Sequence, residues 1–134
     1  MRKIFLLFTL LLMVFLLVQC APHSERRVHE RLSQMAAELN ASAPVMLDAN
    51  TRYDGSSVTD ENHFRYHYTV LNTDNPDSLL SERLQTLTDN IRTMFSTNAE
   101  LAIFREYSVV LEYIYLNEQQ QPLRIITLNP EDYK

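Results

Sequence analysis

His63 and His67 are the first side chains whose types and spacing could do chemistry, because two imidazoles four residues apart can share a metal ion on a helix. They lie, however, in a segment from His63 to Leu71 in which aromatic and β-branched residues alternate with polar ones, and this period of two is typical of a strand. Four strand residues span roughly 13 Å, whereas bonds from nitrogen to zinc are about 2.1 Å long. We therefore expect exposed strand histidines, no metal site and no cofactor.

The acidic and hydroxyl side chains form no recognisable catalytic set. Asp48, Asp54, Asp60 and Glu61 could be paired carboxylates for acid–base catalysis, but acidic residues around predicted turns are more often solvated. No serine lies in a Gly-x-Ser-x-Gly elbow, and a single glycine, Gly55, argues against a glycine-rich phosphate loop. We predict that the protein is not an enzyme.

Cys20 has the clearest chemistry in the chain. The sequence begins with Met1-Arg2-Lys3, continues with 15 uncharged residues from 4 to 18, and reaches Leu17-Val18-Gln19-Cys20. A basic start followed by an apolar run is typical of an export signal, and a helical run of roughly 22 Å is short for a bilayer core of about 30 Å. Leu17, Val18 and Cys20 match a bacterial lipobox, although Gln19 stands where Gly, Ala or Ser is usual.

The leader therefore predicts a lipoprotein. We expect residues 1–19 to be the signal peptide and Cys20 to carry acyl chains such as palmitate, each buried methylene contributing about 0.8 kcal/mol to membrane binding. The protein would then face the periplasm, anchored to the outer or the inner membrane of the cell envelope. An ordinary signal peptide beside a chance cysteine, cleavage after Ala21, and an uncleaved anchor are the alternatives.

Composition limits the rest of the chain, residues 20–134, to a single small domain. The net charge of the whole sequence is −5, and the loss of Arg2 and Lys3 would lower it to −7. Because the sequence has no basic patch, we do not expect the protein to bind nucleic acids. Cys20 is the only cysteine, so no intrachain disulfide can form and the domain must be stabilised by packing.

Two helices are predicted from apolar residues at helical spacing. The first runs from Ser24 to Leu39, and Pro44 ends its pattern. The second begins at Asn75-Pro76, with Asn as the cap and Pro in the first turn. Its expected buried stripe consists of five residues: Leu80, Leu84, Leu87, Ile91 and Met94.

Four strands form two predicted hairpins. The strand ranges are 51–59, 63–71, 108–117 and 123–128, with a short apolar run at 45–47 as a further candidate. Gly55 is expected to mark a bulge in the first strand. The element order is helix, hairpin, helix, hairpin, which predicts an α+β fold with a four-stranded antiparallel sheet and helices on one face.

Aromatic residues recur on alternate positions of two of these strands, at Phe64, Tyr66 and Tyr68 and again at Tyr113 and Tyr115. Such a stripe can be a stacking platform for a ligand or part of the hydrophobic core. Because no basic residues are interleaved as nucleic-acid binding would require, we favour the core.

Five runs of residues carry a resemblance to known sequences: 44–48, 51–54, 64–69, 109–115 and 130–132. Together they resemble a family of small, exported, uncharacterised bacterial proteins, whose pattern is Pro, apolar, Val, Asp, then Thr-Arg-x-Asp, then Tyr-x-Tyr-Thr. The resemblance covers most of residues 44–132 and implies an exported domain without an established activity.

The sequence departs from this family at two cysteines. Members often carry one late in the long helix and another at the C-terminus, which implies a disulfide between tail and helix. The corresponding regions here are Met94-Phe95-Ser96 and Asp132-Tyr133. We expect apolar contact by Tyr133 to hold the tail instead.

The Thr-Arg-x-Asp motif, Thr51, Arg52 and Asp54, is the candidate binding site that the resemblance suggests. An arginine can offer its planar guanidinium to an anionic group on a partner. The alternative, which we favour, is a structural role in a cross-strand ion pair at the hairpin.

These observations predict a non-enzymatic envelope lipoprotein that acts as a binding or accessory domain, an adaptor or assembly factor, for another envelope protein. An inhibitor or immunity-type protein against an envelope enzyme or toxin is the first alternative, and a hydrolase with an unfamiliar site is the second. An exposed apolar groove or sheet edge would favour the adaptor, a polar cleft the enzyme, and a protruding rigid loop the inhibitor.

Overall fold

The computed structural model describes residues 22–134, so the predictions for the leader and for Cys20 lie outside the described residues. The elements, in chain order, are α2 (Pro22–Asn40), β1 (Val45–Met46), β2 (Thr51–Val58), β3 (Phe64–Val70), α3 (Pro76–Thr97), α4 (Ala102–Glu106), β4 (Leu111–Leu116) and β5 (Pro122–Leu128). Short 3-10 turns follow α3 and β5. None of the helices in this part of the chain combines the length and the apolarity that crossing a membrane requires.

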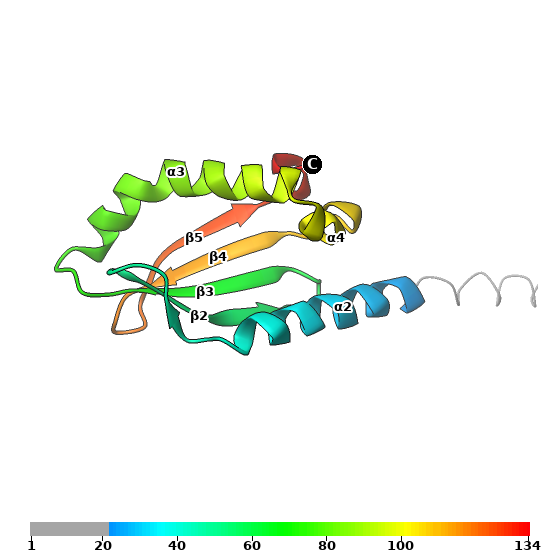
Figure 1. Cartoon of the computed structure of the whole chain (residues 1–134), viewed down its shortest axis with the longest axis horizontal. Helices are drawn as coiled ribbons and strands as arrows, with labels where there is room; N and C mark the ends of the chain where they lie inside the picture. Colours follow the sequence, from blue (N-terminus) through cyan, green and yellow to red (C-terminus); the bar gives the residue numbers. More distant parts are fainter. Residues whose placement is uncertain (1–21) are drawn as a thin grey trace, which may run out of the picture.

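The sheet has five strands in the order β1-β2-β3-β4-β5 (Figure 1). Both predicted hairpins are present, but β3 and β4 pair in parallel, so the expected four-stranded antiparallel sheet is wrong. The reason is α3, which leaves the end of β3 and carries the chain back to the end of the sheet where β3 began. A strand that starts there must run parallel to β3. The short apolar run, Val45–Met46, adds the fifth strand at the edge.

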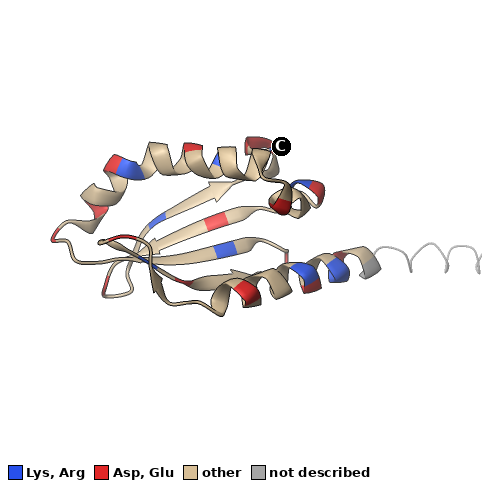
Figure 2. Cartoon of the chain, in the orientation of Figure 1, with Lys and Arg blue, Asp and Glu red and all other residues tan. Residues whose placement is uncertain are grey.

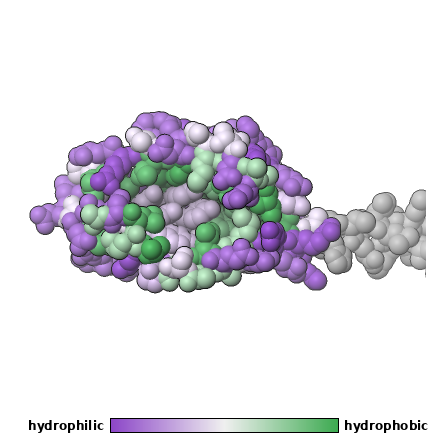
Figure 3. Space-filling model, in the orientation of Figure 1, coloured by the Kyte–Doolittle hydropathy of each residue, from purple (hydrophilic) through white to green (hydrophobic). Residues whose placement is uncertain are grey.

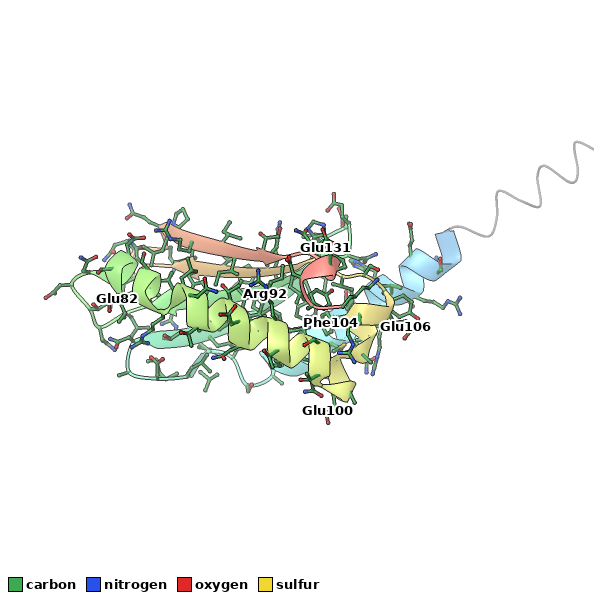
Figure 4. The ribbon with its side chains drawn as sticks, turned by 90° about the horizontal axis from the view of Figure 1, so that it is seen from above. Glu82, Arg92, Glu100, Phe104, Glu106 and Glu131 are labelled. Atoms are coloured by element: carbon green, nitrogen blue, oxygen red, sulfur yellow. The ribbon has the colours of Figure 1, made fainter. Side chains whose placement is uncertain are left out.

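The two long helices lie on the same face of this sheet but far apart from each other. α2 packs on β2, at one side, while α3 lies by β5, at the other (Figures 1 and 4). Strands β2 and β5 are three strand spacings apart, about 14 Å, whereas helices in contact lie about 8–10 Å apart. The central strands β3 and β4 are therefore left without a long helix directly above them, and α4 covers only one end, where Phe104 contacts Phe64.

The cap of α3 follows its local sequence. The Asn75 side chain accepts a hydrogen bond from the Ser78 backbone N–H at 3.2 Å, and Pro76 opens the helix as predicted. The expected core stripe is only partly correct. Leu80 and Ile91 are buried, but Leu84 and Leu87 are half-buried and Met94 is 44% exposed. Leu87 and Met94 lie on the side of α3 that faces α2, which is too far away to cover them.

Gly55, in the middle of β2, lets the C-terminal end of α2 approach the strand closely. The register of β2 shifts between Tyr53 and Gly55, which confirms the predicted bulge. Gly55 has a φ of +143°, and a Cβ there would lie 3.0 Å from Asn40 Oδ1. The close approach lets Asn40 accept from the Ser56 N–H at 2.6 Å and donate to the Ser56 carbonyl at 2.8 Å. These two bonds fix the C-terminal end of α2 against the sheet.

An aromatic cluster fills the core beneath the end of α3. Phe104 packs edge-on against both Phe64 and Phe95, with ring centroids 5.3 and 5.0 Å away. Tyr133, from the C-terminal tail, is 1% exposed and lies 5.8 Å from Phe95. Its hydroxyl donates to the carbonyl oxygens of Phe104 and Val109. The prediction that Tyr133 holds the tail by packing is confirmed.

Candidate functional site

A groove of about 680 Å³ lies between α2 and α3, above the central strands. Its walls come from one side of each helix, one end comes from the loop after β1, and its floor is the sheet. The walls and rim include Met35, Leu39, Leu47, Leu87 and Met94, and the floor includes Tyr66, Tyr68, Tyr113 and Tyr115. Figure 3 shows it as a pale hollow with hydrophobic side chains around it.

The floor consists of stacked tyrosines from neighbouring parallel strands. Tyr66 stacks on Tyr113 with ring centroids 4.7 Å apart, and Tyr68 stacks on Tyr115 at 5.0 Å. The parallel register places Tyr66 beside Tyr113 and Tyr68 beside Tyr115, so each pair comes directly from the pairing of β3 with β4. Tyr113 and Tyr115 are buried, as the core prediction requires, but Tyr66 and Tyr68 are only half-buried, and all four rings line the groove.

The hydroxyls of these four tyrosines have no hydrogen-bond partner among the described residues. No fully buried side-chain oxygen or nitrogen in that part of the chain lacks a partner, so these hydroxyls must reach the open space of the groove. Burial raises the pKa of each, to about 12 for Tyr115, and the neighbouring tyrosines raise it further for Tyr66, Tyr68 and Tyr113. The floor therefore presents neutral hydroxyl groups at any physiological pH.

The rim of the groove exposes large apolar side chains. Leu39 on α2, Leu47 in the loop after β1, and Met94 on α3 are 40%, 59% and 44% exposed. Exposed apolar residues that gather around a hollow are a mark of a binding surface, whereas single scattered ones are ordinary. The unbranched Met94 and Met35 side chains can also adapt to the shape of a ligand.

Three charged residues line the groove in the described part of the chain: Glu38, Asp48 and Arg83. Figure 2 marks the acidic and basic positions along the helices and strands. Arg83 of α3 approaches Asp48 of the loop after β1 at 3.4 Å, and this ion pair joins α3 to the loop that forms one end of the groove. Glu38 on α2 also lines the groove, and its carboxylate accepts from Gln34 at 3.1 Å. One arginine against two carboxylates leaves the lining with a net negative charge.

The Thr-Arg-x-Asp motif is divided between the two faces of the sheet. Thr51 lines the groove, whereas Arg52 and Asp54 lie on the opposite face. Arg52 Nε donates to Asp54 Oδ1 at 2.5 Å, and the buried Thr69 hydroxyl donates to Asp54 Oδ2 at 2.5 Å. Arg52 and Asp54 thus pair with each other within β2, and not across two strands as expected. Thr69 of β3 joins them, and the pair lies away from the groove.

Arg52→Lys is accordingly expected to change the free energy of unfolding by less than about 1 kcal/mol, because the Arg52 side chain is 38% exposed and water screens the ion pair. Partner binding should remain as in the wild type. Thermal melting together with partner capture checks both expectations. A normal melting temperature with lost capture would show that the guanidinium recognises the partner.

A second ion pair lies on this same face. Arg65 on β3 donates to Glu112 on β4, and His63 Nδ1 lies 3.5 Å from the same carboxylate. Burial of Glu112 alone would raise its pKa, but the hydrogen bonds and charges of Arg65 and His63 outweigh this and hold the pKa below its ordinary value of 4.5. Because the Glu112 pKa is lower in the folded state, the pair stabilises the fold above the unfolded pKa and loses this effect as pH falls through the folded one.

We therefore expect Glu112→Gln to reduce stability at pH 7 by up to about 1 kcal/mol, discounted because the Arg65 side chain is 41% exposed. The difference between variant and wild type should shrink as the pH falls below 4.5. Urea titrations at pH 7 and at pH 3.5 measure it. A difference that stays constant between these two pH values would contradict the assignment.

The other candidate residues do not assemble into a reactive site. His67 Nε2 lies 2.9 Å from Ser57 Oγ, on the same face as the Glu112 pair, and His63 belongs to that pair. Asp60 and Glu61 lie in the turn after β2. Among residues 22–134, no group of three or more His, Cys, Asp or Glu side chains is placed to hold a metal ion.

Residues 27–124 match a family described as a domain of unknown function, DUF8479. This range is well over half of the chain and includes all the residues that line the groove. The chain belongs to the DUF8479 family. The family description gives no activity, and no curated protein matches the sequence.

Solved structures share the fold of this DUF8479 member. A crystal structure of a Pseudomonas aeruginosa protein described as secreted aligns with a TM-score of 0.70 at 13% identity, over 82% of this chain and 96% of that one. The pilotin EpsS of the Vibrio vulnificus type 2 secretion system aligns with a TM-score of 0.64 at 13% identity, over 84% and 96%. The pilotin AspS of the Vibrio cholerae type II secretion system aligns at 0.60 and 11%, over 82% and 95%.

The sequence patterns do not reveal the groove of this DUF8479 member. They predict that both the aromatic stripe of the strands and the apolar stripe of α3 belong to the core. One signal in the sequence could have revealed the groove. The aromatic face of the sheet is wider than two helices that lie apart from each other can cover, so that part of the apolar surface must stay open.

Proposed function

We propose that this protein is a non-enzymatic accessory or assembly protein of the bacterial cell envelope, and that its groove binds a helical segment of another envelope protein. The observation that carries the proposal is the uncovered strip of sheet between α2 and α3, rimmed by exposed apolar side chains. An apolar groove of this kind supports an adaptor over an enzyme, which would need a polar cleft. The fold that it shares with pilotins of two type II secretion systems supports an envelope role.

A helix fits the groove better than an extended segment does. A helix satisfies its own backbone hydrogen bonds, so that it can lie in an apolar groove without stranding polar groups. An extended segment would need backbone partners, and neither the apolar walls nor the side chains of the floor supply a row of them. The walls, α2 and α3, also offer helical surfaces for side-chain packing from both sides.

Photo-crosslinking in the native host tests the proposal with two matched positions. A photo-crosslinking amino acid replaces either Leu47, on the rim and 59% exposed, or Ile125, on the opposite face and 58% exposed. We expect one protein to be crosslinked from position 47 and not from position 125. Equal crosslinking from both positions, or none from position 47, would contradict the groove as the binding site.

The envelope location is proposed to depend on Cys20. α2 begins at Pro22, and Met35 on the groove wall lies roughly 20 Å along the helix from there, so that an anchor at Cys20 would hold the groove near the membrane. We expect a fatty-acid analogue to label the wild type and not Cys20→Ala, and the variant to leave the membrane fraction. Equal labelling of both proteins would exclude Cys20 as the acylated residue.

A further inference from the structure

The four floor tyrosines, Tyr66, Tyr68, Tyr113 and Tyr115, favour a partner that can form hydrogen bonds with their hydroxyls. Their hydroxyls have no partner among the described residues, and the rings line the open groove. An occupant with a wholly apolar face would exclude water and leave four phenolic hydroxyls buried without hydrogen bonds. Each such loss is unfavourable, and the effect on affinity multiplies over several groups. The floor therefore discriminates among apolar helices.

The spacing of Tyr66 and Tyr68 along β3 also suits one turn of a helix. Tyr66 and Tyr68 are two residues apart on β3, so that their positions are separated by about 6.6 Å. Residues i and i+4 of an α-helix are separated by about 6 Å along its axis and lie on the same side. In Figure 1, α3 runs roughly along the strands, so a helix that lies beside it follows the same line of tyrosines.

We infer that the partner helix carries uncharged hydrogen-bond acceptors, from Asn, Gln, Ser or Thr, at positions i and i+4 in the middle of an otherwise apolar face. This inference rests on the proposed function and adds the chemistry by which the groove selects its partner. Tyr66 and Tyr68, which are the more exposed pair, donate to these two acceptors. Apolar residues on either side of them pack against Leu39 and Leu87 on the two walls.

The charge of the lining excludes a carboxylate as the acceptor and favours a basic residue near one end. Glu38 has no cationic partner among the described residues, whereas Asp48 is paired with Arg83. An acidic side chain on the partner would lose hydration in the groove and meet these carboxylates at close range. A Lys or Arg at the edge of the partner helix would instead lie beside Glu38.

The experiment uses the segment that crosslinks to position 47, prepared as a synthetic peptide, and the full chain reconstituted in phosphatidylcholine nanodiscs. Empty nanodiscs measure the binding of peptide to lipid. The double variant Tyr66→Phe, Tyr68→Phe removes two hydroxyls and keeps the rings, and Tyr107→Phe removes one from a tyrosine that is 48% exposed outside the groove. We expect the double variant to bind the peptide about 10- to 100-fold more weakly, and Tyr107→Phe to bind it normally.

A second peptide, with the two acceptors replaced by alanine, completes the cycle. This peptide should bind the wild type weakly, and its affinities for the wild type and for the double variant should be equal. It offers no acceptor to the Tyr66 and Tyr68 hydroxyls, so that removing them changes nothing. A crosslinked segment that is uniformly apolar, or an unchanged affinity of the double variant, would overturn the inference while leaving the groove intact as a binding site. A crosslink to lipid or to a second copy of this chain, or an affinity that Leu39→Glu does not lower, would overturn the proposed function as well.

Discussion

Tyr133→Ala is expected to destabilise the domain by about 3–5 kcal/mol, the range for removing a large buried aromatic side chain. Tyr133 is 1% exposed, and its ring completes the cluster with Phe95 and Phe104. Its hydroxyl also donates to the backbone carbonyls of Phe104 and Val109. The Phe104 carbonyl keeps its bond from the Val109 N–H in the alanine variant, but the Val109 carbonyl loses the tyrosine hydroxyl as its donor. A denaturant titration followed by circular dichroism measures the change.

Two further variants separate the contributions of the ring and the hydroxyl. Tyr133→Phe keeps the ring and should lose about 1–3 kcal/mol, for the Val109 carbonyl that loses its donor. Tyr107→Ala removes a tyrosine that is 48% exposed and should change the free energy of unfolding by about 0.5 kcal/mol or less. If Tyr133→Ala were as mild as Tyr107→Ala, the tail would not be part of the folded core.

Leu39→Glu combined with Met94→Glu is expected to weaken partner binding at least about 100-fold while the fold remains intact. The two residues are 40% and 44% exposed and stand on opposite walls of the groove, so that each carboxylate is tolerated in the free protein. In the complex both would be buried against apolar side chains, and an unpaired buried charge costs several kcal/mol. Binding of the crosslinked peptide segment, measured beside thermal melting, gives the two numbers.

Ile125→Glu is the matched control for this pair, because Ile125 is 58% exposed and does not line the groove. It should bind the segment as the wild type does. Equal losses of binding in the control and in the double variant would indicate an effect of net charge on association. The groove would then no longer be supported as the site.

Local signals predicted the elements that local interactions form. Asn75-Pro76 begins α3 because cap and first turn are four consecutive residues, and the alternation from Phe64 to Tyr68 identifies β3 because one face of the strand is aromatic. The bulge at Gly55 is also a local feature, because a φ of +143° is a property of one residue and favours glycine. These features need no knowledge of distant contacts.

The parallel pairing of β3 with β4 and the groove depend on where distant segments lie. Both a meander of hairpins and a crossover through α3 agree with the same order of elements, and only the direction in which α3 returns decides between them. Likewise, an apolar residue such as Leu87 has the same pattern whether its helix is packed or open. Leu87 is half-buried because α2 and α3 lie apart, and the spacing of apolar residues along a helix does not predict how far it lies from another helix.

A structure of the full chain together with its crosslinked partner tests the central claim most directly. We predict a helix of the partner between α2 and α3, with its apolar side chains against Leu39 and Met94 and its central polar side chains over Tyr66 and Tyr68. A partner bound instead along the free edge of β5, or on the face that carries Arg52 and Glu112, would contradict the account and leave the groove without the function proposed for it.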